Sequence, residues 1–285
     1  MAQRARTDVR CRVYYLQSAI CNLQSAICNL QSAIFERWAR RTSGRSGLPW
    51  MLLWLPLAQG LVLGQTTLIV LAALVFAELY YNEGRERRAG LLLALAVLKP
   101  QVAILAAAWL LLRSFRERRY QLPLTFFGIS AALWLVAVII AGPQIVPQWV
   151  AGLVVYDDLL PDRLLLFPPL GPLIGLMAVL LWWRHGRGDH FGLLILLTML
   201  FYPLSVVYMT SAVAFVVIRW RRDWPWYPLA LSWIIPLAFP LVVRTPDTIA
   251  ALTQSIVATG MLAGLLPQLP WRRRPPHPTG GDVLQ

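Results

Sequence analysis

Polar and apolar positions along this chain are separated into long blocks. From residue 48 onward, apolar runs alternate with short loops in which arginine recurs. A helix needs about 20 apolar residues to cross the hydrocarbon core of a membrane, and several of these runs approach that length. The pattern therefore predicts an all-α fold, a polytopic bundle of transmembrane helices.

The boundaries of the runs predict about ten membrane segments. The expected spans are 48–63, 66–81, 89–112, 122–141, 164–183, 191–202, 204–218, 226–243 and 248–266. The run 89–112 counts as two segments, because Lys99 and Pro100 interrupt it.

Two arginine-rich loops, 82–88 and 113–119, flank the run 89–112. A straight helix would place these loops on opposite sides of the membrane, although basic loops collect on the cytoplasmic side. Proline removes a backbone donor and disfavours a helical residue before it. We therefore predict a half-helix hairpin at 89–112, with Lys99 at its tip and both loops inside.

The distribution of arginine then assigns the two sides of the membrane. From residue 82 onward, fifteen arginines lie inside and two, Arg163 and Arg244, lie outside. We expect a multi-pass protein of the cell membrane with both termini in the cytoplasm. Residues 47–268 would form the transmembrane domain, and 269–285 a basic, proline-rich cytoplasmic tail.

Composition agrees with a membrane protein. The chain is 58% hydrophobic and 14% charged, whereas soluble domains carry about 25% charged residues. A net charge of +13 can indicate nucleic-acid binding, but here the arginines lie in short loops between apolar runs, so we expect no nucleic-acid partner. Cys11, Cys21 and Cys28 are the three cysteines, and they form no disulfide or zinc framework.

Residues 1–46 differ from the rest of the chain. Within them, 16–34 repeat the unit Leu-Gln-Ser-Ala-Ile-Cys-Asn. Cys-Asn-Leu-Gln-Ser-Ala-Ile can be encoded by three copies of the seven-base string TGCAATC, so a DNA repeat explains the protein repeat. A heptad coiled coil is the alternative, but the repeat is short and its units are identical. We interpret 1–46 as a repeat-derived segment, either disordered or a displaced N-terminus.

Two polar features are candidates for a binding site. Lys99 is the only lysine in the chain, and a cation inside a membrane suggests a functional site. At the outer mouth of a half-hairpin it can hold a phosphate, whereas the alternative is a lysine that extends to the interface. Gln65, in the turn Gly64-Gln65-Thr66-Thr67, brings a donor and an acceptor, and either threonine can cap the next helix. An ordinary interhelical turn fits this spacing equally well.

Acidic residues provide only weak candidates for catalysis. Asp157 and Asp158 lie in the expected outer loop, where a carboxylate can act as a general base; a solvated acidic loop is the alternative. Asp189 lies between His185 and His190 in an inside loop, and we expect no metal there. No cofactor is expected, since the chain has no P-loop, dinucleotide-binding glycine motif or CxxC.

The central part of the chain resembles glycosyltransferase family 87. The resemblance rests on Gly64-Gln65-Thr66-Thr67, on the run 89–96 after a short basic loop, and on Lys99-Pro100-Gln101. The family pattern is G-Q-x-N, then A-G-L-x-L-A-L-A, then K-P or K-x-Q-P. Thr67 stands where the family usually has asparagine. The similarity is strong over 60–120 and continues mainly in hydropathy to about 266.

The resemblance implies a bacterial inner-membrane transferase with a GT-C-like fold. Such enzymes move a sugar, typically mannose, from a polyprenyl-phosphate donor on the outer face to a lipid or glycolipid acceptor. Lys99 would lie near the lipid phosphate, and Gln65 and Gln101 would complete the substrate-binding set.

One departure from the family affects the expected activity. GT-C enzymes carry a catalytic aspartate in their first outer loop, and this chain has the repeat there; Asp8 and Glu36 are no credible replacements. An inactive transferase is therefore one hypothesis. A transporter or lipid-flipping protein and a non-catalytic membrane scaffold are the alternatives.

Overall fold

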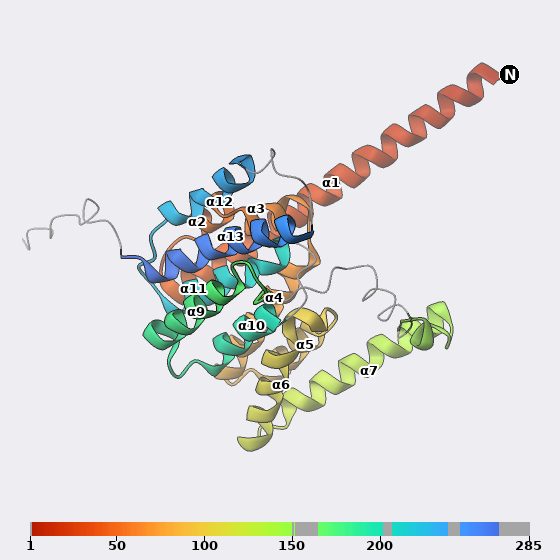
Figure 1. Ribbon diagram of the computed structural model, residues 1–285. Coiled ribbons are helices and arrows are strands. Elements are labelled where there is room, and N and C mark those ends of the chain that lie inside the picture. Colours follow the sequence, from red (N-terminus) through yellow and green to blue (C-terminus); the bar gives the residue numbers. More distant parts are fainter. Residues whose placement is uncertain (1, 150, 152–164, 202–206, 239–245, 268–285) are drawn as a thin grey trace, which may run out of the picture.

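The computed structural model describes residues 2–149, 151, 165–201, 207–238 and 246–267 (Figure 1). These residues form helices and connecting turns, and no strand occurs among them. The elements are α1 Ala2–Ser43, α2 Leu48–Leu53, α3 Leu55–Val62, α4 Thr66–Asn82, α5 Glu86–Ala96, α6 Pro100–Arg116, α7 Gln121–Ala141, α9 Gly171–Leu181, the π-helical turn η1 Trp182–Gly186, α10 His190–Phe201, the 3-10 turn η2 Val207–Ser211, α11 Ala212–Trp220, α12 Tyr227–Ala238 and α13 Pro246–Leu265. The predicted all-α class is confirmed for this part of the chain.

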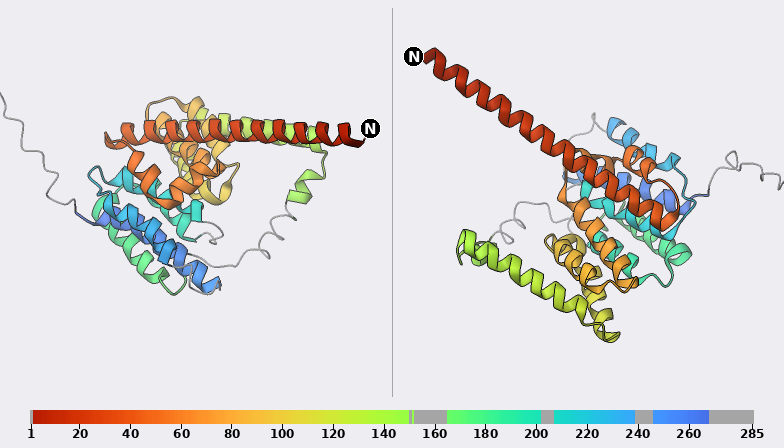
Figure 2. Two further views of the ribbon diagram at one scale, coloured as in Figure 1. Left: turned by 90° about the horizontal axis from the view of Figure 1, so that it is seen from above. Right: turned by 180° about the vertical axis from the view of Figure 1, so that it is seen from behind.

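Two described helices are long and apolar enough to cross a membrane. They are α7 and the Thr248–Leu265 part of α13. A third span results if α3 and α4, which bend by 109° at their junction, are taken together. The exposed side of α7, which projects from the bundle, is apolar, with Leu135 and Ile139 among its exposed residues (Figure 2). The expected total of about ten segments stays a prediction.

The core of the bundle surrounds α11. Every residue from Ala212 to Ile218 is buried, as expected for a helix that is apolar on all sides. α13 and α10 pack against it, and so does the C-terminal part of α1. Aromatic rings join these elements, since Phe35 and Trp38 of α1 lie 5.1 and 4.7 Å from the ring of Phe215.

The chain reverses between α5 and α6. Arg119 Nε, just beyond α6, donates to Glu86 Oε1 at 2.8 Å, and Arg113 Nη1 donates to Asn82 Oδ1 at 3.0 Å. The end of α6 therefore returns to the loop at which α5 begins. Lys99 lies at the turn, directly before the proline that starts α6. The predicted reversal at Lys99 is confirmed, and we name the end that carries the loops 82–88 and 113–119 the arginine-rich end.

The bend between α3 and α4 lies in the Gly64–Gln65 turn. Gly64 has a φ of +61°, a left-handed conformation that glycine adopts without strain. Gln65 occupies the N-cap of α4, and no side chain caps that helix. The expectation that Thr66 or Thr67 caps the helix is therefore wrong, because both residues already lie inside it.

α1 runs parallel to α4 and is packed only along its C-terminal part. Arg41 forms an ion pair with Glu83 at the arginine-rich end, and Gln31 reaches Gln65 at the opposite end. The N-terminal part extends past that opposite end, away from the bundle (Figures 1 and 2). The predicted division at 46/47 stays a prediction.

A close contact between α5 and α7 provides a test of this packing. A Cβ atom at Gly90 would lie 2.6 Å from the carbonyl oxygen of Leu122, closer than real contacts allow. We expect Gly90→Val to force the two helices apart and to lower stability by about 1–3 kcal/mol. Thermal unfolding in detergent measures the effect, and Gly128→Val on α7, where the space is open, is the matched control. Equal melting temperatures of the two variants would contradict the observed α5–α7 contact.

Candidate functional site

The two sequence features proposed for binding meet at one end of the bundle. Lys99 Nζ donates a hydrogen bond to Thr67 Oγ1 at 2.6 Å, although the residues lie 32 positions apart. The break before α6 provides Lys99, and the first turn of α4 provides Thr67. We call Gln65, Thr67 and Lys99 the hairpin-tip site. It lies at the opposite end of α4 and α6 from the arginine-rich end.

Gln65 and Gln101 have different surroundings. The backbone carbonyl of Gln65 accepts a hydrogen bond from Gln31 Nε2 at 2.8 Å, so this turn is held by α1. Gln101 lies in the first turn of α6 and is half-buried. The two predicted catalytic candidates, Asp157 and Asp158, lie outside the described residues.

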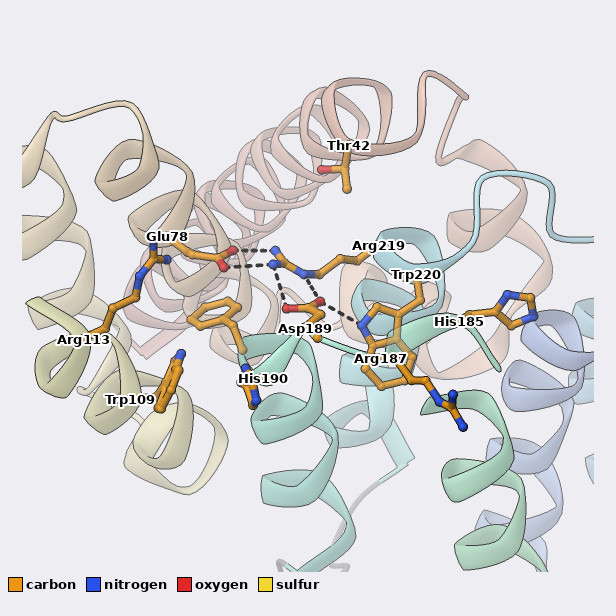
Figure 3. A pocket seen from close by; sticks show the side chains of 12 residues that line it. Thr42, Glu78, Trp109, Arg113, His185, Arg187, Asp189, His190, Arg219 and Trp220 are labelled. Carbon is orange, nitrogen blue, oxygen red and sulfur yellow. Dashed lines mark hydrogen bonds and ion pairs between the residues drawn. The ribbon is translucent and has the colours of Figure 1, made fainter. Parts of the chain in front are cut away.

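A cavity of about 700 Å³ lies at the arginine-rich end (Figure 3). Its walls come from the C-terminal parts of α1, α4, α6 and α11, from η1 and from the start of α10. The lining residues are Thr42, Glu78, Trp109, Arg113, His185, Arg187, Gly188, Asp189, His190, Phe191, Arg219 and Trp220. The cavity is thus separate from the hairpin-tip site.

Arg219 bridges two acidic residues in this cavity. Its Nη1 and Nη2 donate to the carboxylate of Glu78 at 2.5 and 2.9 Å, and Nη2 also donates to Asp189 Oδ1 at 2.9 Å. The Glu78 side chain is only 6% exposed, and Trp220 Nε1 donates to Asp189 Oδ2 at 2.8 Å. Because these carboxylates are occupied by donors, the network holds α4, α10 and α11 together and offers no free general base.

Electrostatics keep Asp189 ionised. Burial alone would raise the pKa of Asp189, but hydrogen bonds and the charge of Arg219, with the Gly192 amide and the Trp220 indole, hold it below its usual range. Burial lowers the pKa of His185, and the nearby Arg221 and Arg184 lower it further. Within the described residues, no group of three or more His, Cys, Asp or Glu side chains is placed to hold a metal ion.

The network was missed at the sequence level. Glu78 and Arg219 are 141 residues apart, and no motif connects them. The only signal was Glu78 itself, the single acidic residue in the apolar run 66–81. An isolated charge in such a run needs a partner.

Comparison with known proteins identifies a family. The family model of Glycosyltransferase family 87 matches residues 26–243. No curated protein and no solved structure matches the chain. The matched range includes α4 to α6 with the hairpin-tip site, and also the cavity network. Because the match covers most of the chain, this protein belongs to glycosyltransferase family 87.

Proposed function

We propose that the protein transfers a sugar, mannose, from a polyprenyl-phosphate donor to a lipid or glycolipid acceptor in the bacterial inner membrane. Family membership supports glycosyl transfer. The choice of donor is supported by the position of Lys99. This residue donates a hydrogen bond to Thr67 at the point where the chain reverses within an apolar run. A compact cation at that depth fits a lipid-linked phosphate.

The chemistry requires a leaving phosphate and an activated acceptor hydroxyl. In our proposal, Lys99 stabilises the charge that develops on the departing lipid phosphate. A carboxylate removes the proton from the acceptor hydroxyl, and the candidates for this role remain Asp157 and Asp158. Gln65 and Gln101 are proposed to bind the donor beside Lys99.

The proposed orientation places the arginine-rich end in the cytoplasm and the hairpin-tip site toward the outer face. The contacts of Arg113 and Arg119 with the loop 82–88 support this orientation, because they gather the basic loops at one end. The C-terminal part of α13 also lies at the arginine-rich end, where Arg221 Nη1 donates to the carbonyl oxygen of Gly264 at 2.7 Å. We do not propose a cytoplasmic amino terminus, because α1 extends past the end of the bundle that bears the hairpin-tip site.

Lys99→Gln tests the proposed role of the lysine. We expect transfer of labelled mannose from polyprenyl-phosphate mannose in proteoliposomes to fall by about 100-fold, since the charge that meets the leaving phosphate is lost. Lys99→Arg should retain part of the activity. The control is Arg116→Gln, an exposed change on the same helix at the other end.

Three results would reject the proposal. Full transfer by Lys99→Gln would show that Lys99 does not act on the phosphate. Solute uptake or lipid flipping by the unaltered protein, without any sugar transfer, would favour the transporter alternative. If the unaltered protein shows neither sugar transfer nor transport, the result would favour the non-catalytic scaffold.

A further inference from the structure

We propose that the repeat segment of α1 is a positioning element for the hairpin-tip site, and this proposal rests on the proposed function. Gln24 and Gln31 occupy the same place in successive seven-residue units. Seven residues make nearly two helical turns, so both side chains lie on one face of α1. That face lies against the turn between α3 and α4.

Each of the two glutamines binds a backbone carbonyl at this turn. Gln24 Nε2 donates to the carbonyl oxygen of Val62 at 2.8 Å, and Gln31 Nε2 donates to that of Gln65 at 2.8 Å. Between them, Ile27 Cγ2 lies 3.5 Å from the position that a Cβ atom on Gly64 would take. Val62 is the last residue of α3, where helical carbonyls lack intrahelical partners. We name Gln24, Ile27 and Gln31 the α1 clasp.

The helix that bears the clasp is fixed in the core. Phe35 and Trp38 are buried against Phe215 of α11. The backbone amide of Gly47 donates to Glu36 Oε2 at 2.7 Å, which holds the end of α1 to the following loop. The clasp is therefore anchored to the centre of the bundle, and it holds the turn between α3 and α4 in place relative to that centre.

Gln31 is not explained by packing alone. Its side chain is buried, with 3% of its surface exposed, and Oε1 has no hydrogen-bond partner in the structure. A buried acceptor without a partner is unfavourable, so an apolar side chain of similar size would serve packing better. The amide is useful only through its donor, which reaches the carbonyl of Gln65.

The hydrogen bond to Gln65 acts on Lys99 through the start of α4. Gln65 is the N-cap of α4, and Thr67, two residues later, accepts the hydrogen bond from Lys99. Holding the carbonyl of Gln65 therefore fixes the direction in which α4 begins and the place of the Lys99 ammonium. Without the clasp, Gly64 would leave the turn flexible. The Lys99 ammonium would then no longer be held in the orientation that we propose for binding the phosphate.

The test compares the Gln24→Leu/Gln31→Leu double variant with the unaltered full chain in nanodiscs. We expect faster hydrogen exchange at the amides of residues 64–68 and about tenfold weaker binding of polyprenyl monophosphate, the effect of losing two hydrogen bonds. The KM for the donor should rise by a similar factor while kcat stays within about twofold. Asn29→Leu, an exposed amide on the same helix, is the control and should change none of these quantities.

The outcomes separate this proposal from the proposed function. If the unaltered protein binds polyprenyl monophosphate and the double variant binds it equally tightly, the clasp is rejected and the function stands. If neither protein binds this probe but exchange at 64–68 rises in the variant, the clasp stands and the proposed donor is rejected. A fall in kcat with unchanged KM and unchanged exchange would also reject the clasp, because it would indicate a role outside donor positioning.

Discussion

Arg219→Met is expected to lower the stability of the protein by about 3–5 kcal/mol, the usual cost of removing one partner from a buried ion pair. The change leaves Glu78 and Asp189 facing each other without their shared cation. Their carboxylates would be buried and adjacent, and no other described side chain forms an ion pair with either. We expect a large fall in melting temperature, measured by fluorescence-detected thermal unfolding in detergent.

The same variant should respond to pH in a way that the unaltered protein does not. Arg219 holds the pKa of Asp189 below its usual range, and without this cation burial would raise that pKa instead. A raised carboxyl pKa means that the folded state binds a proton more tightly than the unfolded state, so stability recovers as pH falls. The melting temperature of Arg219→Met should therefore rise between about pH 8 and about pH 5.

Arg187→Met is the matched control for Arg219→Met. Arg187 lines the same cavity, but it is exposed and lies 4.8 Å from the centre of the Trp183 ring. Its loss should change stability by no more than about 1 kcal/mol. Similar melting temperatures for the two variants would show that the bridge to Glu78 and Asp189 does not stabilise the bundle.

Trp38→Ala is expected to destabilise the protein by about 3–5 kcal/mol, as large-to-small changes of buried aromatic residues do. The indole is 1% exposed and lies 4.7 Å from the ring of Phe215. Its removal opens a cavity where α1 meets α11. Thermal unfolding in detergent measures the loss, and Arg37→Ala, an exposed neighbour, is the control.

This experiment also tests the interpretation of residues 1–46. If the segment is repeat-derived and independent of the fold, Trp38→Ala and Arg37→Ala should behave alike. A large effect of Trp38→Ala alone would show that the helical bundle needs α1. The family match begins at residue 26, within the repeat, and so makes the large effect the expected one.

Local physical chemistry made the reversal at Lys99 predictable. A lysine and a proline interrupt an apolar run, and two basic loops must share one side of the membrane. These constraints act within about forty residues of chain, from the loop 82–88 to the loop 113–119, so the sequence contains all of them. The resemblance in Gly64-Gln65-Thr66-Thr67 and Lys99-Pro100-Gln101 predicted the family for the same reason, because both motifs are short and continuous.

The contact between Lys99 and Thr67 was only half predictable. Both residues were singled out, but nothing in the spacing requires that one donate to the other. That contact depends on the packing of α4 against α6, which is set by the side chains of both helices and by the turn before each. The role of α1 was not predicted at all, since a repeat of identical units indicated an accidental segment rather than a packed helix.

By itself, the sequence determined that this protein is helical, apolar enough to enter a membrane, reversed at Lys99 and related to glycosyltransferases. Only the tertiary structure decided that Glu78, Asp189 and Arg219 form one network and that Gln24 and Gln31 bind the turn before α4. The difference has a physical reason. Hydropathy, proline and loop charge act on neighbouring residues, whereas an ion pair across 141 residues exists only after several helices have packed.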